Sequence, residues 1–295
     1  MADLHTSPLT ARFGVEIHGL DLCDVTADHL FADIRSAFEA HSALLFRQQD
    51  LDPETHMRLA QLFGPMEDRY PEERQKGEGY KIPEVSNVRA DGSVSDEMDL
   101  HTLNLKSNML WHADSTFLPT PALTNILTAK VVTSTGGATE LASTRAAFAD
   151  MSEEKQAKLR VTRLRHHYAH SRARISPELA KLPMFNKWPE TQWPAVWKNP
   201  VNGLEAVYVA SHAFAVEGMD ADEGAAFIDD LVEWCTRPQY VYSHQWQVGD
   251  VLIWDQRAVL HRGTPWPWEE PRKLASICSS VTDADGLAAM RAGGA

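Results

Sequence analysis

At residues 111–117 the chain reads Trp111-His112-Ala113-Asp114-Ser115-Thr116-Phe117, and this stretch holds a His-x-Asp pair. On a β-strand, alternate side chains point to the same face, so the imidazole of His112 and the carboxylate of Asp114 can reach one ion. Far downstream, an apolar run, a short turn and a second apolar run predict two strands, the second of which ends at His261. The sequence therefore predicts that these three side chains meet at one site in a β-rich fold.

Two imidazoles and one carboxylate on a single face form the ligand set of a mononuclear Fe(II) oxygenase, which leaves positions open for a co-substrate and oxygen. Each part also has a simpler explanation. A His-x-Asp pair occurs by chance in many chains, and His112 could be a hydrogen-bonded core histidine. His261 could be an ordinary sheet histidine, since the chain has 13 histidines. The residues that accompany the three ligands decide between these alternatives.

Short apolar runs separated by turn-rich residues fill the chain after Trp111. These runs are 126–132, 206–210, 240–246, 251–254 and 258–261. Many short strands are typical of a sandwich or jelly roll. An apolar stripe with a polar opposite side predicts a helix over 221–235. We therefore expect a mainly β fold with flanking helices and a double-stranded β-helix (jelly-roll) core, in which early and late strands become neighbours.

The first part of the chain mixes helix and strand signals. Apolar residues at every fourth position predict a helix over about 27–40, and a buried strand is expected at 43–46. A second helix should begin at Pro53, with Asp52 as its N-cap, and end at Gly64.

Residues 68–110 break this pattern with charged and glycine-containing stretches, which predict a long loop. A loop of that length inside a compact domain is often a lid over a site. No repeat and no long linker divides the sequence. We expect residues 1–295 to form a single domain, with a lid or loop insertion at about 68–110.

Composition limits the partners and the compartment. The 295 residues are 43% hydrophobic, and the formal net charge of −13 would repel a phosphate backbone, so we expect no nucleic-acid partner. Three cysteines without a CxxC pair argue against a disulfide framework and fit a reducing compartment. No targeting pattern begins the chain, and no stretch reaches the roughly 18 apolar residues of a membrane span. We expect a cytoplasmic protein without a membrane partner, and composition leaves open whether it forms a homo-oligomer.

Two further residues suggest a site for a carboxylate. Arg272 lies eleven residues beyond His261, and Thr139 follows the pair Gly136-Gly137. The planar fork of an arginine matches a carboxylate with two parallel charge-assisted hydrogen bonds, and a hydroxyl can complete the remaining acceptor sites. On the residues alone, Arg272 could instead pair at the surface with Glu269-Glu270, and Thr139 could be a plain turn residue.

Together these motifs resemble the taurine and 2,4-dichlorophenoxyacetate dioxygenase family. The family pattern is a His-x-Asp, a Gly-Gly-x-Thr, a Trp-Asp before the distal His-Arg-Gly, and an Arg eleven residues after that His, and all occur here in order. The resemblance implies a catalytic iron centre in which His112, Asp114 and His261 bind Fe(II). It also implies that Arg272 and Thr139 bind the distal carboxylate of 2-oxoglutarate, and that O2 is the second co-substrate.

One departure from the family pattern follows the Trp-Asp, where relatives commonly have Asn and this chain has Gln256, one methylene longer. The extra methylene puts a turn hydrogen bond in doubt, but it removes no metal ligand.

Within this family, the closest resemblance is to the aryloxyalkanoate branch. It rests on 111–117, Ser86-Asn87-Val88, Gly218-Met219-Asp220 and Ser243-His244-Gln245-Trp246. That branch hydroxylates the carbon next to an ether oxygen, and the resulting hemiacetal collapses to a phenol and an oxo acid. Members that bind taurine carry a second arginine where this chain has Ser276, and a neutral hydroxyl cannot replace a bidentate cation. The resemblance favours a small organic acid of the aryloxyalkanoate type, with a taurine or alkylsulfonate substrate as the alternative.

Five residues are candidates for contacting the substrate. By resemblance these include Asn108 and His212, although Asn108 could be a loop hydrogen-bonder and His212 could satisfy buried backbone groups. The substrate anion would be met by Lys81, Arg89 or Lys106. Each of these three could instead be a solvated surface charge.

Two other classes of protein stay open at the level of fold, because one fold hosts many functions. A non-catalytic jelly-roll binding module would be expected to lose a metal ligand or Arg272, and neither is missing. A zinc hydrolase could use the same three ligands, but it would have no reason to need Arg272 and Thr139.

Overall fold

The computed structural model describes residues 4–69, 71 and 78–293. A sheet with the strand order β1-β2-β3-β13-β5-β15-β4 forms its centre. Its strands are β1 (Thr6–Pro8), β2 (Val15–Ile17), β3 (Ala43–Phe46), β13 (Val251–Asp255), β5 (Ala122–Val131), β15 (Lys273–Ser280) and β4 (Glu84–Ser86). The β2–β3 pair is parallel and the other pairs of this sheet are antiparallel.

The central strands of this sheet are buried on both faces, which explains their uninterrupted apolar sequences. In β13, Val251 and Ile253 face one core cluster, whereas Leu252 and Trp254 face another. Successive side chains of a strand point to opposite faces, so a strand covered on both sides needs apolar residues at every position. The predicted strands at 43–46 and 251–254 are both present.

A smaller sheet, in the order β12-β6-β14, packs against one face of the large sheet. It consists of β12 (Val241–His244), β6 (Thr139–Ser143) and β14 (Val259–Gly263). The core between the two sheets includes Leu141 and Val259 from the small sheet, and Leu127 and Trp254 from the large one. The two facing sheets therefore bring β14, which contains His261, close to β5, which begins at Ala122.

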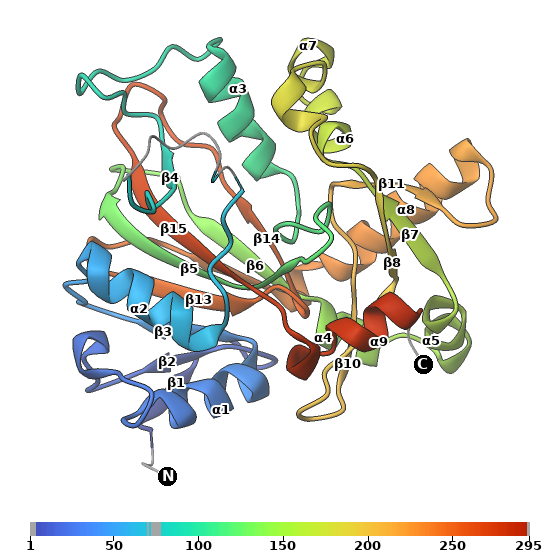
Figure 1. Cartoon of the computed structure of the whole chain (residues 1–295), viewed down its shortest axis with the longest axis horizontal. Helices are drawn as coiled ribbons and strands as arrows, with labels where there is room; N and C mark the ends of the chain where they lie inside the picture. The colour runs from blue at the N-terminus through green and yellow to red at the C-terminus, as the bar shows by residue number, and fades with distance from the viewer. Residues whose placement is uncertain (1–3, 70, 72–77, 294–295) are drawn as a thin grey trace.

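Two helices, α1 (Phe31–His41) and α2 (Pro53–Phe63), cover the other face of the large sheet (Figure 1). The predicted cap of α2 is confirmed, because the Asp52 carboxylate accepts a hydrogen bond from the Thr55 N–H at 2.7 Å. The helix predicted over 27–40 begins only at Phe31. Leu30 adopts a left-handed backbone conformation at φ 65°, which a helix cannot continue.

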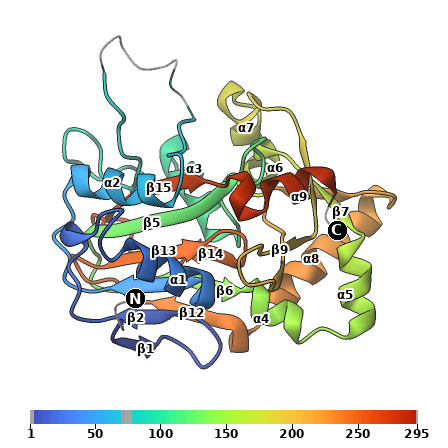
Figure 2. The same cartoon turned by 60° about the horizontal axis from the view of Figure 1, so that its bottom comes forward.

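The remaining elements form a second group beyond the small sheet. Its strands are β7 (Arg163–His166), β8 (Thr191–Pro194) and β11 (Ala213–Val216) in one sheet, and β9 (Val196–Lys198) and β10 (Glu205–Val207) in another. Its helices are α4 (Thr144–Ala149), α5 (Glu153–Arg160), α6 (Tyr168–Ala173), α7 (Pro177–Ala180) and α8 (Ala221–Cys235), and the chain ends with α9 (Leu287–Ala292). Helices α4, α5 and α8 lie at the end of the molecule away from α2 (Figure 2).

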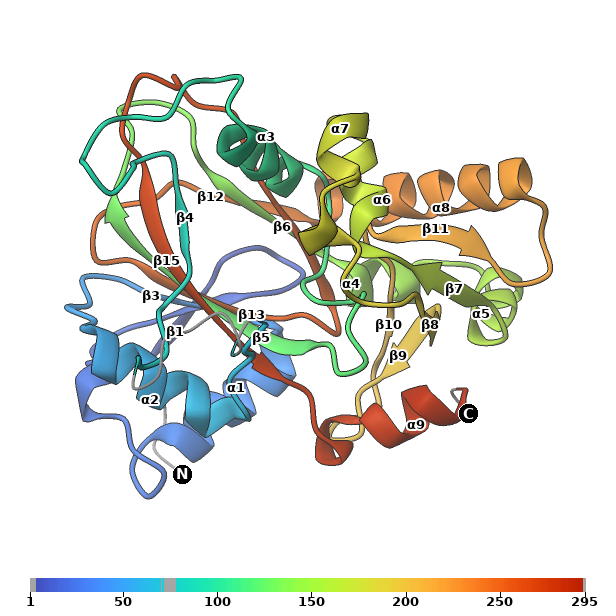
Figure 3. The same cartoon turned by 45° about the horizontal axis from the view of Figure 1, so that its top comes forward.

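The segment 68–110 is only partly the loop that its sequence predicts. It contains β4, the helix α3 (Leu100–Lys106) and the 3-10 turn η3 (Ser107–Met109), while residues 70 and 72–77 lie outside the described part. Helix α3 sits beside α6 and α7 (Figure 3). The sequence did not predict this helix, because it follows a charged stretch and its apolar side is short. Its stability comes from packing against other elements.

The structure is therefore sheet-rich with helices packed outside, which agrees with the expected class. Two predicted strands are shorter than expected: 206–210 is a strand only over Glu205–Val207, and 240–246 only over Val241–His244. Within the described residues, no helix is both long and apolar enough to cross a bilayer.

Candidate active site

Side chains from two distant parts of the sequence meet between the two sheets. His112, Asp114 and His261 each offer a ligand atom, and these atoms lie within 4.8 Å of one another. The Nε2 atoms of His112 and His261 are 3.9 and 3.6 Å from the Asp114 carboxylate, and the two imidazole rings are 4.0 Å apart. One metal ion can contact all three groups, so the donor set suits the two-histidine, one-carboxylate pattern.

The backbone brings these ligands together by a bridge rather than by a long strand. His112 and His261 exchange two backbone hydrogen bonds, with N–O distances of 3.0 and 2.8 Å. The chain leaves this bridge at once and turns, since Ser115 has φ 61°. The expectation that the His-x-Asp pair lies on a regular strand is therefore wrong beyond His112, and the turn places Asp114 instead.

Burial keeps the two imidazoles neutral, which is the form that binds a metal. Loss of solvent lowers the pKa of His261 to about 3 and also lowers the pKa of His112. Nδ1 of His112 bonds to the carbonyl of Leu110 at 2.7 Å, so its other nitrogen, Nε2, faces the site as an acceptor. Nδ1 of His261 is buried and makes no hydrogen bond within the described residues.

The Asp114 carboxylate is held by a set of neighbouring donors. Its Oδ2 accepts from Asn125 Nδ2 at 2.9 Å and from Gln256 Nε2 at 2.6 Å, and the Cys278 thiol lies at 3.6 Å. The Gln256 Oε1 also accepts from the Asp114 N–H at 2.9 Å, so the Gln256 side chain binds both the carboxylate and the backbone N–H of Asp114. Burial alone would raise the pKa of Asp114, but the adjacent His261, His112 and Arg69 side chains and the hydrogen bond from Asn125 outweigh it and lower that pKa well below its usual range.

A cavity of about 590 Å³ opens beside the ligands. Its wall includes His112, Asp114 and His261, and also Thr139 and Arg272. The rest of the wall combines apolar side chains such as Leu105, Leu127, Tyr168, Trp254 and Trp266 with polar ones. A ligand cavity of this size with a few convergent polar groups is typical of a small-molecule site.

Arg272 is a buried cation in this cavity rather than a surface residue. It is 4% exposed, and its Nη2 donates to the Gly137 carbonyl at 2.8 Å while the guanidinium lies 4.8 Å from the Trp266 ring. Among the described residues it forms no ion pair with a carboxylate, and Glu270 instead binds Ser134. Burial lowers the pKa of Arg272 to about 10. A desolvated guanidinium that faces a cavity is suited to binding an anion.

Thr139 lies at the start of β6, opposite Gly263 of β14. It is buried, and its hydroxyl accepts a hydrogen bond from Trp246 Nε1 at 3.0 Å. The glycine pair before it adopts positive φ at both positions, and a Cβ on Gly137 would lie 3.0 Å from the Arg272 Nε. The glycines therefore allow the loop to approach Arg272 closely, and Thr139 and Arg272 share one wall of the cavity.

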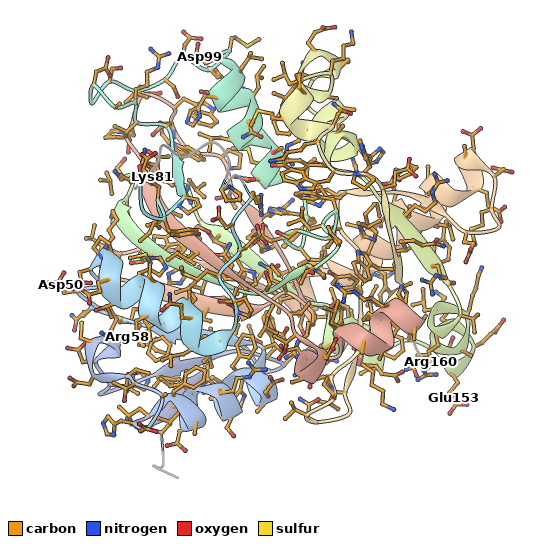
Figure 4. All side chains as sticks on the ribbon, in the orientation of Figure 1. Asp50, Arg58, Lys81, Asp99, Glu153 and Arg160 are labelled. Carbon is orange, nitrogen blue, oxygen red and sulfur yellow. The ribbon has the colours of Figure 1, made fainter. Side chains whose placement is uncertain are left out.

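The three cations expected to meet the substrate anion lie at the periphery. The side chain of Lys81 lines the cavity but is 77% exposed and paired with Glu78, and Figure 4 shows it near β4. Arg89 pairs with Asp99, which Figure 4 marks at the outer end of α3, and Lys106 pairs with Glu97. Arg89 and Lys106 are not among the described residues that form the cavity wall.

The structure separates the two remaining candidates. Asn108, in η3, lines the cavity. His212 is 3% exposed and does not line it; its ring packs edge-on against His112 with centroids 6.4 Å apart. Its Nδ1 is 3.3 Å from the Thr116 hydroxyl. His212 thus packs behind His112 and not on the cavity wall, and its role in substrate binding stays a prediction.

Three residues near the ligands were missed from the sequence as parts of the site. Asn125 reaches Asp114 from β5, and Gln256 was noted only as a departure from the family pattern. Arg172, in α6, lines the cavity and is 7% exposed. No local motif marks these residues, although the buried turn after Trp254 was a usable signal for Gln256.

Residues 5–278 match the model of the family described as "Taurine catabolism dioxygenase TauD, TfdA family". The chain belongs to this family. It is 32% identical over 275 residues to the (S)-phenoxypropionate/alpha-ketoglutarate-dioxygenase of Sphingobium herbicidovorans, with 90% of this chain and 91% of that one covered. It is 31% identical over 271 residues to the alpha-ketoglutarate-dependent 2,4-dichlorophenoxyacetate dioxygenase of Cupriavidus pinatubonensis, with 91% and 94% covered.

Among solved structures, the crystal structure of AAD-2 in complex with Mn(II) and N-oxalylglycine superposes with a TM-score of 0.86. The two chains are 30% identical over 95% of this chain and 98% of the other. This TauD/TfdA chain is accordingly an Fe(II)- and 2-oxoglutarate-dependent dioxygenase that uses O2 as co-substrate, as its motifs predict. Mn(II) and N-oxalylglycine in the similar structure stand in for Fe(II) and 2-oxoglutarate.

Proposed function

We propose that this dioxygenase binds Fe(II) through His112, Asp114 and His261, holds the distal carboxylate of 2-oxoglutarate with Arg272 and Thr139, and hydroxylates an aryloxyalkanoate. The single observation that carries the proposal is that a buried arginine, without a carboxylate partner among the described residues, faces the same cavity as the neutral two-histidine, one-carboxylate cluster. A hydrolase would have no use for that arginine.

The roles of the chain's own groups follow from their positions. The two neutral imidazoles and the ionised Asp114 supply the charge and shape that a divalent ion needs. When bound, the iron and 2-oxoglutarate supply the oxidising chemistry. The Arg272 guanidinium orients 2-oxoglutarate by its far end, and the apolar wall of the cavity keeps bulk water away from the reacting carbon.

An aryloxyalkanoate suits this site better than a sulfonate does. Its oxidised carbon lies between the ether oxygen and the carboxylate, so hydroxylation there gives a hemiacetal that collapses to a phenol and an oxo acid. Ser276 occupies the position of the second arginine of taurine-binding members, and its hydroxyl donates to the Asn125 Oδ1 at 2.9 Å. Asn125 in turn holds Asp114, so Ser276 serves the metal ligands and offers no cation to a sulfonate.

The wider organisation fits a jelly-roll core in a single domain, with segment 68–110 as a covering element. In the described part of that segment, Tyr80, His101, Asn104 and Asn108 line the cavity. We infer that this segment closes over bound substrate. The free cysteines Cys23, Cys235 and Cys278 suit the reducing cytoplasm, where we place the enzyme.

The experiment is succinate release from 2-oxoglutarate by Fe(II)-loaded enzyme with a panel of aryloxyacetates, aryloxypropionates and taurine. The expected result is succinate and phenol in equal amounts with at least one aryloxy acid. Faster turnover of taurine or another alkylsulfonate than of every aryloxy acid would replace the substrate class. Metal binding without substrate-dependent succinate release across the panel would support a non-catalytic binding module instead.

A further inference from the structure

Arg172 is a buried cation on the wall of the active-site cavity, and it comes from a different element than the groups assigned to 2-oxoglutarate. It belongs to the short helix α6, whereas Arg272 precedes β15. Its side chain lines the same cavity as His112 and Asp114, and the residue is 7% exposed. A second buried guanidinium in one cavity needs a function of its own, because burying a cation is costly.

The guanidinium of Arg172 is held in one orientation by its neighbours. Nε donates to the Asn104 Oδ1 at 3.2 Å, Nη1 to the Ser171 hydroxyl at 2.8 Å and Nη2 to the Tyr168 hydroxyl at 3.2 Å. The same group stacks over the Tyr168 ring at 4.3 Å and the Phe185 ring at 5.1 Å. A pre-oriented arginine loses little freedom on binding, so it is suited to the planar recognition of a carboxylate.

Arg172 shares the cavity wall with the metal-binding cluster. Its side chain lines the cavity together with those of His112, Asp114 and His261. An anion bound at Arg172 would therefore lie in the same cavity as the metal ligands.

Apart from Arg272, which is assigned to 2-oxoglutarate, the other cations on the cavity wall are more exposed than Arg172. The side chains of Arg69, Arg262 and Lys81 are 25, 39 and 77% exposed, and they pair with Glu67, Glu140 and Glu78. An exposed charge is screened by water and salt, whereas a buried one attracts an anion more strongly. Burial thus favours Arg172 over the peripheral lysines and arginines as the charge that selects an acid.

We propose that Arg172 binds the carboxylate of the organic-acid substrate, with Asn104 and Tyr168 beside it. The inference deepens the proposed function and rests on it for the aryloxy class. In a 2-aryloxyalkanoate the carboxylate is bonded directly to the carbon that is oxidised. An anchor at Arg172 therefore fixes which hydrogen of that carbon faces the metal site.

The surroundings of Arg172 also suit the aryl ring. Tyr168 lines the cavity and stacks on Phe117 with centroids 3.9 Å apart, and Phe185 meets it edge-on at 5.0 Å. Because Phe117 and Arg172 cover the faces of the Tyr168 ring, an aryl ring of the substrate would contact the cavity-facing edge of Tyr168 beside the anchor. Asn104 lies in α3, so the anchor also joins segment 68–110 to α6.

The test is equilibrium binding to protein loaded with Mn(II) and N-oxalylglycine, which needs no turnover. Isothermal titration compares 4-chlorophenoxyacetate with its neutral amide, and also tests 2-phenoxypropionate, decanoate and taurine. In the wild type the acid binds more tightly than the amide. Arg172→Gln is expected to weaken the acid about tenfold to a hundredfold, as loss of one charge-assisted hydrogen bond predicts, and to change the amide less than threefold.

Arg89→Gln is the matched control, because it removes an arginine that pairs with Asp99 away from the cavity wall, and it is expected to leave both affinities unchanged. Arg172→Lys keeps the positive charge but lacks the planar guanidinium, so it should retain part of the preference for the acid over the amide. This variant replaces Arg172→Gln in the test if Arg172→Gln does not fold. An unchanged N-oxalylglycine affinity shows that the cavity is intact.

Equal weakening of the acid and the amide, or no change for either, would overturn the anchor. If the wild type binds an alkanoate or taurine but no aryloxy acid, and Arg172→Gln weakens the binding of that anion, the aryloxy substrate class is wrong. The role of Arg172 as the carboxylate or sulfonate anchor is then still supported. If the wild type binds none of the anions tested, the anchor is wrong.

Discussion

Replacing Arg272 by methionine is the most informative perturbation of the 2-oxoglutarate site. Burial lowers the pKa of Arg272 to about 10, well below the ordinary value of an arginine, so below pH 10 the folded protein without ligand bears a cost of roughly 3 kcal/mol for keeping this group charged. Arg272→Met removes that cost, but it also removes the hydrogen bonds to Gly137 and the contact with Trp266. These opposing effects are expected to leave the free energy of unfolding without ligand within about 2 kcal/mol of the wild type.

Binding of 2-oxoglutarate should respond differently. One charge-assisted hydrogen bond contributes about 1.5 to 3 kcal/mol, so the variant is expected to bind 2-oxoglutarate about tenfold to a hundredfold more weakly. The assay is anaerobic calorimetric titration of Fe(II)-loaded protein with 2-oxoglutarate, with Fe(II) affinity measured separately and expected to be unchanged. Arg262→Met, which removes a cavity arginine paired with Glu140, is the control and should change the 2-oxoglutarate affinity less than threefold.

An unchanged 2-oxoglutarate affinity in Arg272→Met, together with poor binding of a substrate acid, would refute this reasoning. Arg272 would then anchor the substrate, and the co-substrate would have to bind elsewhere in the cavity.

The remaining predictions concern the metal ligands and the core. Alanine at any one of His112, Asp114 and His261 should abolish substrate-dependent succinate release, and near-normal turnover would remove that residue from the site. Gln256→Asn shortens the side chain that grips Asp114 at 2.9 and 2.6 Å, so Fe(II) affinity measured by titration should fall about tenfold to a hundredfold; an unchanged affinity would make Gln256 a plain turn residue. Burial lowers the pKa of His56 to about 4, below its unfolded value of about 6.5, so the stability it contributes is present above pH 6.5 and is lost as the pH falls towards 4. Urea unfolding at pH 7.5 and 4.5 should show a loss of roughly 2.5 kcal/mol from this group that His56→Gln removes, and an equal loss in both proteins would contradict the assignment.

The sequence was sufficient for features that depend on local chemistry. The cap and start of α2 follow from Asp52 and Pro53, whose side chains act on the next turn of the backbone. The metal-ligand cluster and the co-substrate arginine were predictable because the motif spacing carries the family resemblance. The apolar run at 251–254 was also clear, since a strand buried on both faces leaves a continuous signal.

Tertiary structure alone decided which charges reach the cavity. Lys81, Arg89 and Lys106 precede the metal motif in sequence, yet they are paired near the surface, whereas Arg172 comes from a helix 60 residues beyond His112 and is buried. Burial of a cation depends on the elements that pack around it, and no spacing along the chain records that packing. The support of Asp114 has the same origin, because Asn125 and Gln256 reach it from adjacent strands and turns that only the sheet topology brings together.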